Sequence, residues 1–460
     1  MKHLLHILLL SLAIASCKKP EPCCPVDPVD PVDSTAQWTQ YGSPFTSVPS
    51  PEEVVMYEVN PLVFSSTRDL QGVIGSLDEI KALGVNVVWL MPIYEMGEDR
   101  SVGSPYCISD YLQVNPSYGT LEDLRELVDS AHEKGMAVML DWVANHTAWD
   151  HVWMSDRDYY VQENGVIIHP PGTNWQDVAE LNYANAEMRA EMISAMKYWV
   201  LEANVDGFRC DYATGVPGWF WQEAIDSLRS IPNRDLIMFA ESGDLTLLSK
   251  GFDMAFSWNY YGTLLNVFNN NGNARDLYTT HRSEFSSLAA GKTTVRFVTN
   301  HDQHAWDGTP QQLFGSQEAV MAAAASAFYM GGIPLMYNGQ EIAVPYQLPF
   351  FVPTSVAINW SLNPTVRTQY EELLAAYHDY EFLRSSEIEK DYSTFALSAV
   401  EKIANGDTAL VIINTRNELK ALNLPANWQN RNVTDIFTQA SVGLGSQLNL
   451  DPYEVRVLKR

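Results

Sequence analysis

Residues 205–211 read Val-Asp-Gly-Phe-Arg-Cys-Asp, a short apolar run that ends in charged side chains. Because side chains alternate along a strand, Arg209 and Asp211 lie on the same side of it. Similar runs recur along the chain, separated by stretches with apolar residues at helical spacing, such as 121–134. The pattern predicts strands at 54–59, 86–91, 136–141, 205–211, 236–241, 253–258, 294–300 and 333–337.

Eight strands that alternate with helices predict an α/β fold. Repeated βα units form a parallel sheet, and eight of them close into a (β/α)8 TIM barrel, here at 37–385 with a last helix near 366–383. The connection after the third strand, 146–182, is far longer than the roughly two to six residues usual for such loops, which predicts a small excursion domain. Residues 386–460 contain β-rich runs between Asn and Gly residues, which predicts a C-terminal antiparallel β-sandwich.

Polar side chains gather where four of the predicted strands end. Catalytic groups of such barrels lie at the C-terminal ends of the strands, so we expect the four segments to converge on one site. They read Asp141-Trp-Val-Ala-Asn145-His146, Gly207-Phe-Arg-Cys-Asp211, Phe239-Ala-Glu241 and Phe297-Val-Thr-Asn-His301-Asp302.

Two carboxylates in this group have opposed surroundings. Arg209 is expected to lower the pKa of Asp211 and keep it ionised, as a nucleophile requires. Glu241 follows the apolar run 236–240, which is expected to keep it protonated, as a general acid requires. Glycoside hydrolysis uses such a pair, and retaining enzymes hold the two carboxyl groups about 5 to 5.5 Å apart.

The four strand ends resemble, in order, the four signature regions of the α-amylase family, glycoside hydrolase family 13. Residues 103–120, Gly-Ser-Pro-Tyr-Cys-Ile-Ser-Asp-Tyr-Leu-Gln-Val-Asn-Pro-Ser-Tyr-Gly-Thr, resemble that family's loop after its second strand. Residues 332–341, Gly-Ile-Pro-Leu-Met-Tyr-Asn-Gly-Gln-Glu, resemble its eighth strand. The similarity covers roughly residues 50–385. It implies the same barrel, followed by a C-terminal sandwich.

The resemblance implies a role for each matching side chain. Asp211 would be the nucleophile, Glu241 the general acid and base, and Asp302 the carboxylate that holds sugar hydroxyls and stabilises the transition state. Five further residues would bind the sugar or position these groups: His146 and His301 by hydrogen bonds, Tyr106 by stacking, Arg209 by positioning the nucleophile and Asp141 by bracing the arrangement.

The reaction implied is retaining hydrolysis of α-glucosidic bonds, of the α-1,4 type, in starch, glycogen or maltooligosaccharides. Two departures leave linkage and acceptor preference open: Tyr212-Ala-Thr-Gly215 stands where many members carry a Lys-His pair or an acidic residue, and Ser242 stands where a larger apolar residue is common. A transglycosylase or a sucrose- or trehalose-converting enzyme of the same family is an alternative. A sugar-binding lipoprotein without turnover is another.

Asn145 matches a calcium ligand of the family, and Asp150, Asp156 and Asp177 in the excursion are candidate partners. Hard oxygen ligands suit calcium, so a structural calcium ion is one interpretation. The other is that Asn145 hydrogen-bonds the loop, and both stay open. No organic cofactor is expected. Tryptophans stand in loops or at strand ends at 149, 153, 175, 219, 221, 258 and 306. Two interpretations of them are open: they stack on sugars, or they pack within the protein.

The N-terminal sequence is typical of an exported lipoprotein. A short apolar run at 4–14 followed by small residues predicts a signal peptide at 1–16, too short to span a bilayer. Ile14-Ala-Ser-Cys17 resembles the bacterial lipobox, which makes Cys17 the expected lipidation site; a secretory signal with a chance cysteine is the alternative. Residues 17–36 are rich in proline and are expected to form a tether. The expected location is the bacterial cell envelope, in the periplasm or at the outer membrane or cell surface.

The charge of the chain limits its partners. Fifty-six Asp and Glu residues against 29 Lys and Arg give a net charge of -27, which repels phosphate backbones and anionic lipid surfaces. Nucleic acid is therefore not expected as a partner, and membrane contact is expected only through the lipid anchor. A neutral, hydroxyl-rich substrate is compatible with this charge. Beyond the tether only Cys107 and Cys210 remain, which gives no disulfide framework.

Overall fold

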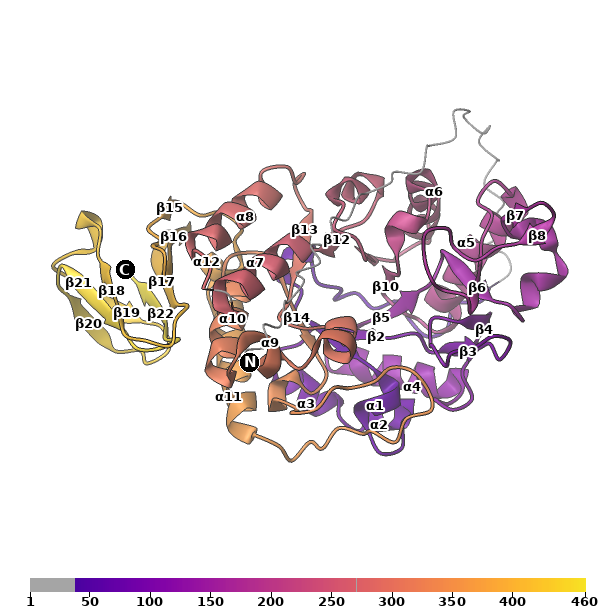
Figure 1. Cartoon of the computed structure of the whole chain (residues 1–460), viewed down its shortest axis with the longest axis horizontal. Coiled ribbons are helices and arrows are strands. Elements are labelled where there is room, and N and C mark those ends of the chain that lie inside the picture. The colour runs from indigo at the N-terminus through magenta and orange to yellow at the C-terminus, as the bar shows by residue number, and fades with distance from the viewer. Residues whose placement is uncertain (1–37, 270) are drawn as a thin grey trace, which may run out of the picture. The chain divides into compact units, whose positions relative to one another are not determined.

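Eight parallel strands form a closed barrel in the computed structural model, which describes residues 38–269 and 271–460 (Figure 1). The predicted α/β barrel is confirmed, and each predicted strand overlaps an observed one. The signal peptide, Cys17 and the tether lie outside the described residues. Around the barrel the strands are β1 (Met56–Val59), β2 (Val87–Leu90), β5 (Ala137–Trp142), β10 (Gly207–Cys210), β11 (Ile237–Ala240), β12 (Met254–Phe256), β13 (Thr293–Arg296) and β14 (Ile333–Tyr337).

Two predicted elements end elsewhere than expected. The sequence predicts a strand through Asn300, but β13 ends at Arg296. The side chain of Asn300 accepts hydrogen bonds from the next amides, those of Asp302 and Gln303, and thereby begins a turn. The single helix predicted at 366–383 is divided, because Tyr380 has an extended backbone between two shorter helices.

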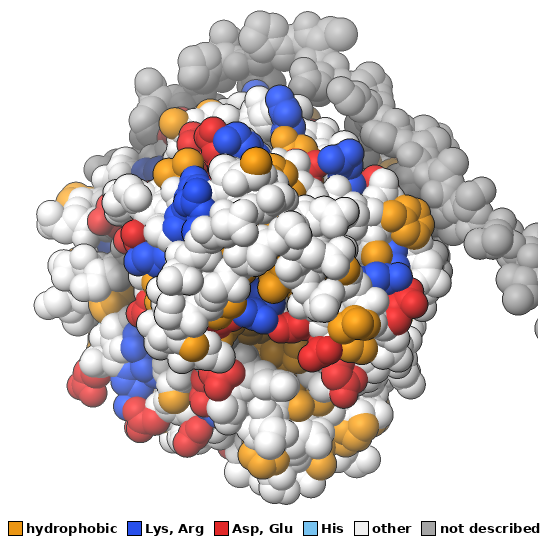
Figure 2. All heavy atoms as spheres, turned by 90° about the vertical axis from the view of Figure 1, so that its left-hand side faces the viewer, with side chains coloured by type: hydrophobic (Ala, Val, Ile, Leu, Met, Phe, Trp, Pro, Cys, Tyr) orange, Lys and Arg blue, Asp and Glu red, His pale blue; other side chains and the backbone are white. Residues whose placement is uncertain are grey.

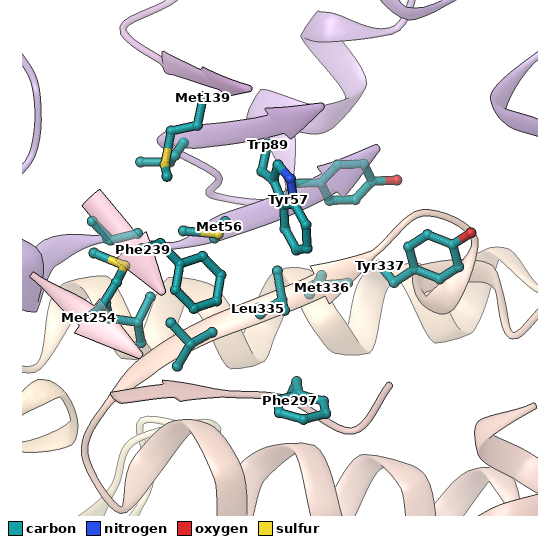
Figure 3. Packing of buried hydrophobic residues seen from close by; sticks show 14 of the residues in the cluster. Met56, Tyr57, Trp89, Met139, Phe239, Met254, Phe297, Leu335, Met336 and Tyr337 are labelled. Atoms are coloured by element: carbon teal, nitrogen blue, oxygen red, sulfur yellow. The ribbon is translucent and has the colours of Figure 1, made fainter. Parts of the chain in front are cut away.

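Large apolar side chains from different strands fill the barrel interior (Figure 3). Trp89 meets Phe239 edge to face, with ring centroids 5.9 Å apart, and Met139, Met254 and Leu335 are completely buried around them. Burying one such side chain stabilises the fold by roughly 1.5 to 3 kcal/mol. Because the interior is solid, the pocket can form only at the ends of the strands.

Helices surround the barrel, and α4 shows why they form where they do. Thr120 and Asp123 make a reciprocal capping box at its start, Leu124 and Leu127 are buried, and Gly135 takes a left-handed conformation just after its end. Among the helices of 38–269 and 271–460, none is both long and apolar enough to cross a membrane. The helices are α1 (Pro61–Phe64), α2 (Leu70–Ile74), α3 (Leu77–Ala82), α4 (Leu121–Glu133), α5 (Ala186–Glu202), α6 (Gly218–Arg229), α7 (Trp258–Asn269), α8 (Arg275–Phe285), α9 (Pro310–Phe314), α10 (Gln317–Tyr329), α11 (Pro364–Asp379) and α12 (Glu381–Arg384).

Short antiparallel ribbons extend from the carboxyl ends of β2 and β5. The hairpin of β3 (Tyr94–Met96) and β4 (Ile108–Val114) follows β2. After β5, the excursion pairs β6 (His146–Ala148) with β9 (Val178–Glu180) and β7 (Gln162–Glu163) with β8 (Val166–Ile167). The β3–β4 hairpin and the excursion both carry residues to the side of the barrel where the predicted site lies.

The C-terminal part is antiparallel, as predicted, with a six-stranded and a two-stranded sheet. Its own apolar core includes Trp428, Leu410 and Leu458. On the face seen in Figure 2, acidic and basic side chains are interspersed, with hydrophobic ones between them in small groups. The domain limits at 37 and 385 stay predictions. The strands are β15 (Lys390–Asp391), β16 (Leu397–Ala404), β17 (Asp407–Asn414), β18 (Lys420–Asn423), β19 (Arg431–Asp435), β20 (Ser441–Leu444), β21 (Gln447–Leu450) and β22 (Val455–Lys459).

Candidate active site

One buried guanidinium joins three carboxylates from three strand ends. Strand register places Arg209 of β10 directly beside Asp141 of β5. Its Nη1 lies 2.8 Å from Asp141 Oδ1 and 3.0 Å from Asp211 Oδ1, and its Nη2 lies 3.1 Å from Glu241 Oε2. Arg209 is 1% exposed, so water screens these contacts little. The structure therefore brings together the predicted nucleophile, the predicted acid and their two predicted supports.

The backbone after Asp211 reaches back to the predicted acid. Tyr212 adopts a left-handed conformation with φ of 40°, and its amide N–H donates to Glu241 Oε2 over 2.6 Å. The amide of Glu241 in turn donates to the carbonyl of Cys210 over 2.9 Å. These bonds fix the ends of β10 and β11 against each other, so the two carboxylates are held by both backbone and side chains.

The pKa values of these two carboxyls run opposite to the sequence-based prediction. Burial, and then the charge of Glu241, raise the pKa of Asp211 well above its usual range, against the opposing effect of Arg209. Burial also raises the pKa of Glu241, but Arg209 and the Tyr212 amide outweigh burial and hold that pKa below its usual value. The prediction is wrong for the free site, because Arg209 contacts both carboxylates.

His301 connects both sides of the site. Its Nδ1 lies 2.5 Å from Glu58 Oε1, while its Nε2 lies 2.8 Å from the Tyr106 hydroxyl and 3.6 Å from Asp302 Oδ2. Burial lowers the pKa of His301, but the charges of Asp302 and Glu58 outweigh burial and raise it to about 9. The sequence analysis does not identify Glu58 as a site residue. The signal that could have found it is a carboxylate inside the otherwise apolar run 54–59.

The carboxylates open into a pocket of about 560 Å³, a size usual for small-molecule sites. Asp141 and Arg209 lie beneath its floor, fully buried. Burial lowers the pKa of His146 to about 4, so this imidazole is neutral at neutral pH. Six of the predicted site residues line the pocket: Tyr106, His146, Asp211, Glu241, His301 and Asp302.

Aromatic side chains form much of the rest of the wall. Trp175 of the excursion meets Tyr212 edge to face at 5.1 Å. On the wall built by the loops after β13 and β14, Trp306 is 62% exposed and contacts Phe350 and Phe351 by ring edges. Of the tryptophans noted in the sequence, 175 and 306 therefore line the pocket, whereas 221 is buried in packing. Nothing in the pattern around 350–351 indicates a site role.

Asn145 and two of its candidate partners, Asp150 and Asp156, make hydrogen bonds to neighbouring protein groups. Asp150 accepts the amide N–H groups of Glu98 and Asp99, and Asp156 accepts that of Asp158. The side-chain nitrogen of Asn145 lies 3.2 Å from His146 Nδ1, and the backbone carbonyl of Asn145 accepts the amide N–H of Leu181. In the part of the chain that the structure describes, no group of three or more His, Cys, Asp or Glu residues could hold a metal ion. No catalytic step is therefore assigned to calcium.

Buried carboxylates at barrel strand ends, opening into a pocket with aromatic walls, define the catalytic domain of a glycoside hydrolase. Residues 58–237 match the family model of the alpha-amylase catalytic domain. Over these residues the barrel is therefore similar to the catalytic domain of the alpha-amylase family, in line with the resemblance seen in the sequence.

Known proteins similar to this chain agree with that assignment. Alpha-amylase 3 of Dictyoglomus thermophilum is 28% identical over 340 residues, which are 65% of this chain and 66% of that protein. An oligo-1,6-glucosidase of Bacillus cereus is 34% identical over 197 residues, 35% of each protein. The crystal structure of an alpha-amylase from Lactobacillus plantarum superposes with a TM-score of 0.80 and 26% identity, covering 89% of this chain and 99% of that one. This chain thus spans about a third to two thirds of the length of the two curated relatives.

Proposed function

We propose that this protein hydrolyses α-glucosidic bonds, of the α-1,4 type, in starch, glycogen or maltooligosaccharides, with retention of configuration. The observation that carries the proposal is the Arg209 guanidinium, which contacts Asp211 and Glu241 within 3.1 Å at the floor of the pocket. Two carboxylates that share one small cation are close together, which suits the short separation of retaining enzymes. The similarity to an alpha-amylase supports the substrate class.

The proposed reaction has two displacements. An oxygen of Asp211 attacks the anomeric carbon, the bond to the leaving oxygen breaks, and Glu241 gives that oxygen its proton. This forms a covalent glycosyl-enzyme. Water then attacks the same carbon, Glu241 accepts a proton from the water, and the bond to Asp211 breaks. Asp302, which lines the same pocket, holds sugar hydroxyls.

This reaction needs an ionised Asp211 and a protonated Glu241. In the free site, burial and the charge of Glu241 raise the pKa of Asp211, while Arg209 and the Tyr212 amide lower the pKa of Glu241 against the effect of burial. The reaction therefore requires these preferences to reverse when substrate fills the site.

Product analysis tests the proposal. The protein is incubated with starch, pullulan, dextran, sucrose and maltotetraose, and the products are identified. We expect glucose or short maltooligosaccharides from starch and maltotetraose, released with the α configuration. Asp211→Asn should lose this activity by at least about 10⁴-fold while keeping the fold. Products longer than the starting maltotetraose would favour the transglycosylase, turnover of sucrose would favour the sucrose-converting alternative, and activity unchanged in Asp211→Asn would contradict the mechanism.

The similarity to an oligo-1,6-glucosidase makes linkage the first question for this test. Pullulan contains both α-1,4 and α-1,6 bonds, and dextran mainly α-1,6 bonds, so their products separate the two preferences. We propose that the enzyme prefers α-1,4 linkages. If the products show another preference, we attribute it to the wall formed by Trp175 and Tyr212. That wall stands next to Glu241, where the leaving sugar must lie if Glu241 protonates the leaving oxygen.

We propose from the sequence that Cys17 is lipidated and holds the protein at the bacterial cell envelope. The basis is the lipobox-like Ile14-Ala-Ser-Cys17 and the proline-rich stretch 17–36. Metabolic labelling with a radioactive fatty acid, followed by fractionation, checks it: the wild type should carry label in the membrane fraction, and Cys17→Ser should not. Wild-type protein without label would show that the cysteine stands there by chance.

A further inference from the structure

Glu58 is a buried acid that the reaction described above does not use. It lies on β1, in register with Trp89 of β2, and is completely buried. A carboxylate among apolar side chains is unfavourable unless it is paired. In the described residues its Oε2 has no hydrogen-bond partner, and its Oε1 has one, His301. The hydrogen bond that Glu58 makes is therefore to the residue whose ring lines the pocket.

The contact with His301 decides what that ring can do. Glu58 Oε1 accepts the Nδ1–H of His301 over 2.5 Å, which leaves Nε2 directed at the pocket. There Nε2 meets the Tyr106 hydroxyl at 2.8 Å and Asp302 Oδ2 at 3.6 Å. An orienting acceptor behind one ring nitrogen fixes both the tautomer and the direction of the other.

Charged groups face His301 from every side of the site. Asp302 follows it in the chain, Glu58 lies behind it, and Asp141, Arg209 and Glu241 act on it across the pocket floor. Trp89 and Phe350 cover it with apolar edges at 5.9 and 5.2 Å. Four carboxylates and one guanidinium therefore surround this ring, so a cation is favoured despite the burial.

We propose that Glu58 is a positioning residue that holds His301 as an imidazolium, with its Nε2–H aimed at the bound sugar and at Asp302. The proposal rests on the hydrolytic function proposed above. In that reaction the imidazolium donates to a sugar hydroxyl and offsets the repulsion between Asp302 and the other carboxylates as positive charge develops on the sugar ring. Glu58 itself touches no substrate.

Glu58→Gln tests the proposal, because it removes the charge and keeps the size. The pKa of His301 is measured by NMR of labelled histidine, with its signal assigned through His301→Asn. In the wild type it should be about 9. In Glu58→Gln we expect it to fall by at least about one unit. The alkaline limb of kcat/KM for maltotetraose should move down with it, and kcat/KM at pH 7 should fall roughly 10- to 100-fold, as when other orienting partners of histidines are lost.

Glu341→Gln is the matched control. Glu341 is also a fully buried carboxylate, in the short 3-10 helix Gln340–Ile342 after β14, and its Oε1 accepts a hydrogen bond from Tyr57, the neighbour of Glu58, at 2.5 Å. It does not contact His301 in any bond that the structure records. We expect Glu341→Gln to leave the His301 titration and the alkaline limb unchanged, whatever it does to the melting temperature. The same shift in both variants would show a general effect of disturbing the barrel and overturn the proposal.

The outcomes also separate this proposal from the hydrolytic function. If the wild type cleaves glucans but Glu58→Gln leaves the His301 titration and the pH profile unchanged, only the role of Glu58 is overturned. If the wild type cleaves no glucan, the function fails, and the NMR titration still decides the contact. If Glu58→Gln does not fold, the wild type decides alone: a neutral His301 ring at pH 7 overturns the proposal, and an imidazolium with a downfield Nδ1–H supports it.

Discussion

At the scale of single residues, the site depends on Arg209 more than on any one carboxylate it contacts. Replacement by methionine would leave Asp141, Asp211 and Glu241 without this cation. Removing one partner of a buried ion pair typically costs about 3 to 5 kcal/mol. We expect Arg209→Met to lower the free energy of unfolding by about that amount at pH 7, measured by urea denaturation, and to abolish hydrolysis.

Arg209→Lys separates charge from geometry. Lysine keeps the charge but has one nitrogen, which cannot reproduce contacts made by both Nη1 and Nη2. We expect most of the stability to remain while kcat falls at least about 100-fold. Arg296→Met serves as the control, since Arg296 pairs with Glu284 at 2.8 Å, fully buried in the same barrel. It should be destabilised similarly yet retain its kcat below its melting temperature. A Lys variant as active as the wild type would contradict this assignment.

The sequence predicts which residues meet at the site but not how they titrate. Asp211 and Glu241 close apolar runs, and parallel strands bring their carboxyl ends together, so their convergence follows from the pattern. Their pKa values depend on where the guanidinium of Arg209 points, and it contacts both. Glu58 is missed for a related reason. Its importance comes from a contact with a residue 243 positions away, which no local pattern contains.

At the scale of elements, the loops after β13 and β14 form a wall whose most exposed side chain is Trp306. An exposed aromatic residue adds little to stability but offers a flat face to a sugar. We expect Trp306→Ala to raise KM for maltoheptaose about fivefold, which corresponds to about 1 kcal/mol, with kcat and melting temperature almost unchanged. Steady-state kinetics with maltoheptaose and with a short aryl glycoside measure this.

A second exposed aromatic residue provides the comparison. Phe395, in the C-terminal part, is 61% exposed, almost as much as Trp306, but does not line the pocket. Phe395→Ala should leave KM unchanged for both substrates. If Trp306→Ala behaves in the same way, the side chain of Trp306 does not bind substrate.

The excursion between β5 and α5 allows a test of the two interpretations of Asn145. Its candidate partners Asp150 and Asp156 already accept backbone amides, Asp150 from the segment between β3 and β4 and Asp156 from within the excursion. We expect the melting temperature and activity to be unchanged by EDTA and by added calcium, measured by calorimetry. A ligand that binds only the folded state stabilises it by mass action. A clear fall in melting temperature on chelation would therefore favour calcium.

Elements are predictable here where local pattern and global fold agree. The capping box at Thr120 and the glycine at 135 mark α4 in the sequence, and both appear in the structure. The end of β13 is less predictable, because apolar residues continue to Val298 while the hydrogen bonds of the strand stop at Arg296. In most of the barrel the buried residues are also the paired ones, but at β13 the buried run continues beyond the strand pairing.

At the scale of the whole molecule, the barrel and the C-terminal sheets each follow from the sequence, but the contact between them does not. Lys402 of β16 is completely buried there, and its Nζ donates to the carbonyl of Tyr329 at the end of α10 over 2.7 Å. It also donates to the carbonyl of Leu383 in α12 over 3.2 Å. In sequence, a lysine in a β-rich run is normally taken for a solvent-facing residue, so its burial is visible only once the two parts are assembled.

This buried lysine makes stability depend on pH. Burial lowers the pKa of Lys402 from about 10.5 to about 7. Between those values the unfolded chain binds a proton at Lys402 that the folded chain does not, so the contribution of Lys402 to stability rises with pH, by at most about 1.4 kcal/mol per pH unit. Below pH 7 both states are protonated and this contribution stays at its minimum.

The difference in unfolding free energy between wild type and Lys402→Met isolates this effect, because all other titrating groups are common to both. From urea denaturation at pH 7, 8 and 9, we expect the wild type to gain stability relative to Lys402→Met as pH rises. Lys459→Met is the control: Lys459 lies on β22 of the same sheet, but its side chain is 32% exposed and paired with Asp407. Its difference from wild type should stay flat over that range. A flat difference for Lys402→Met as well would mean that Lys402 keeps its proton in the folded protein, with the two carbonyls alone stabilising a buried charge.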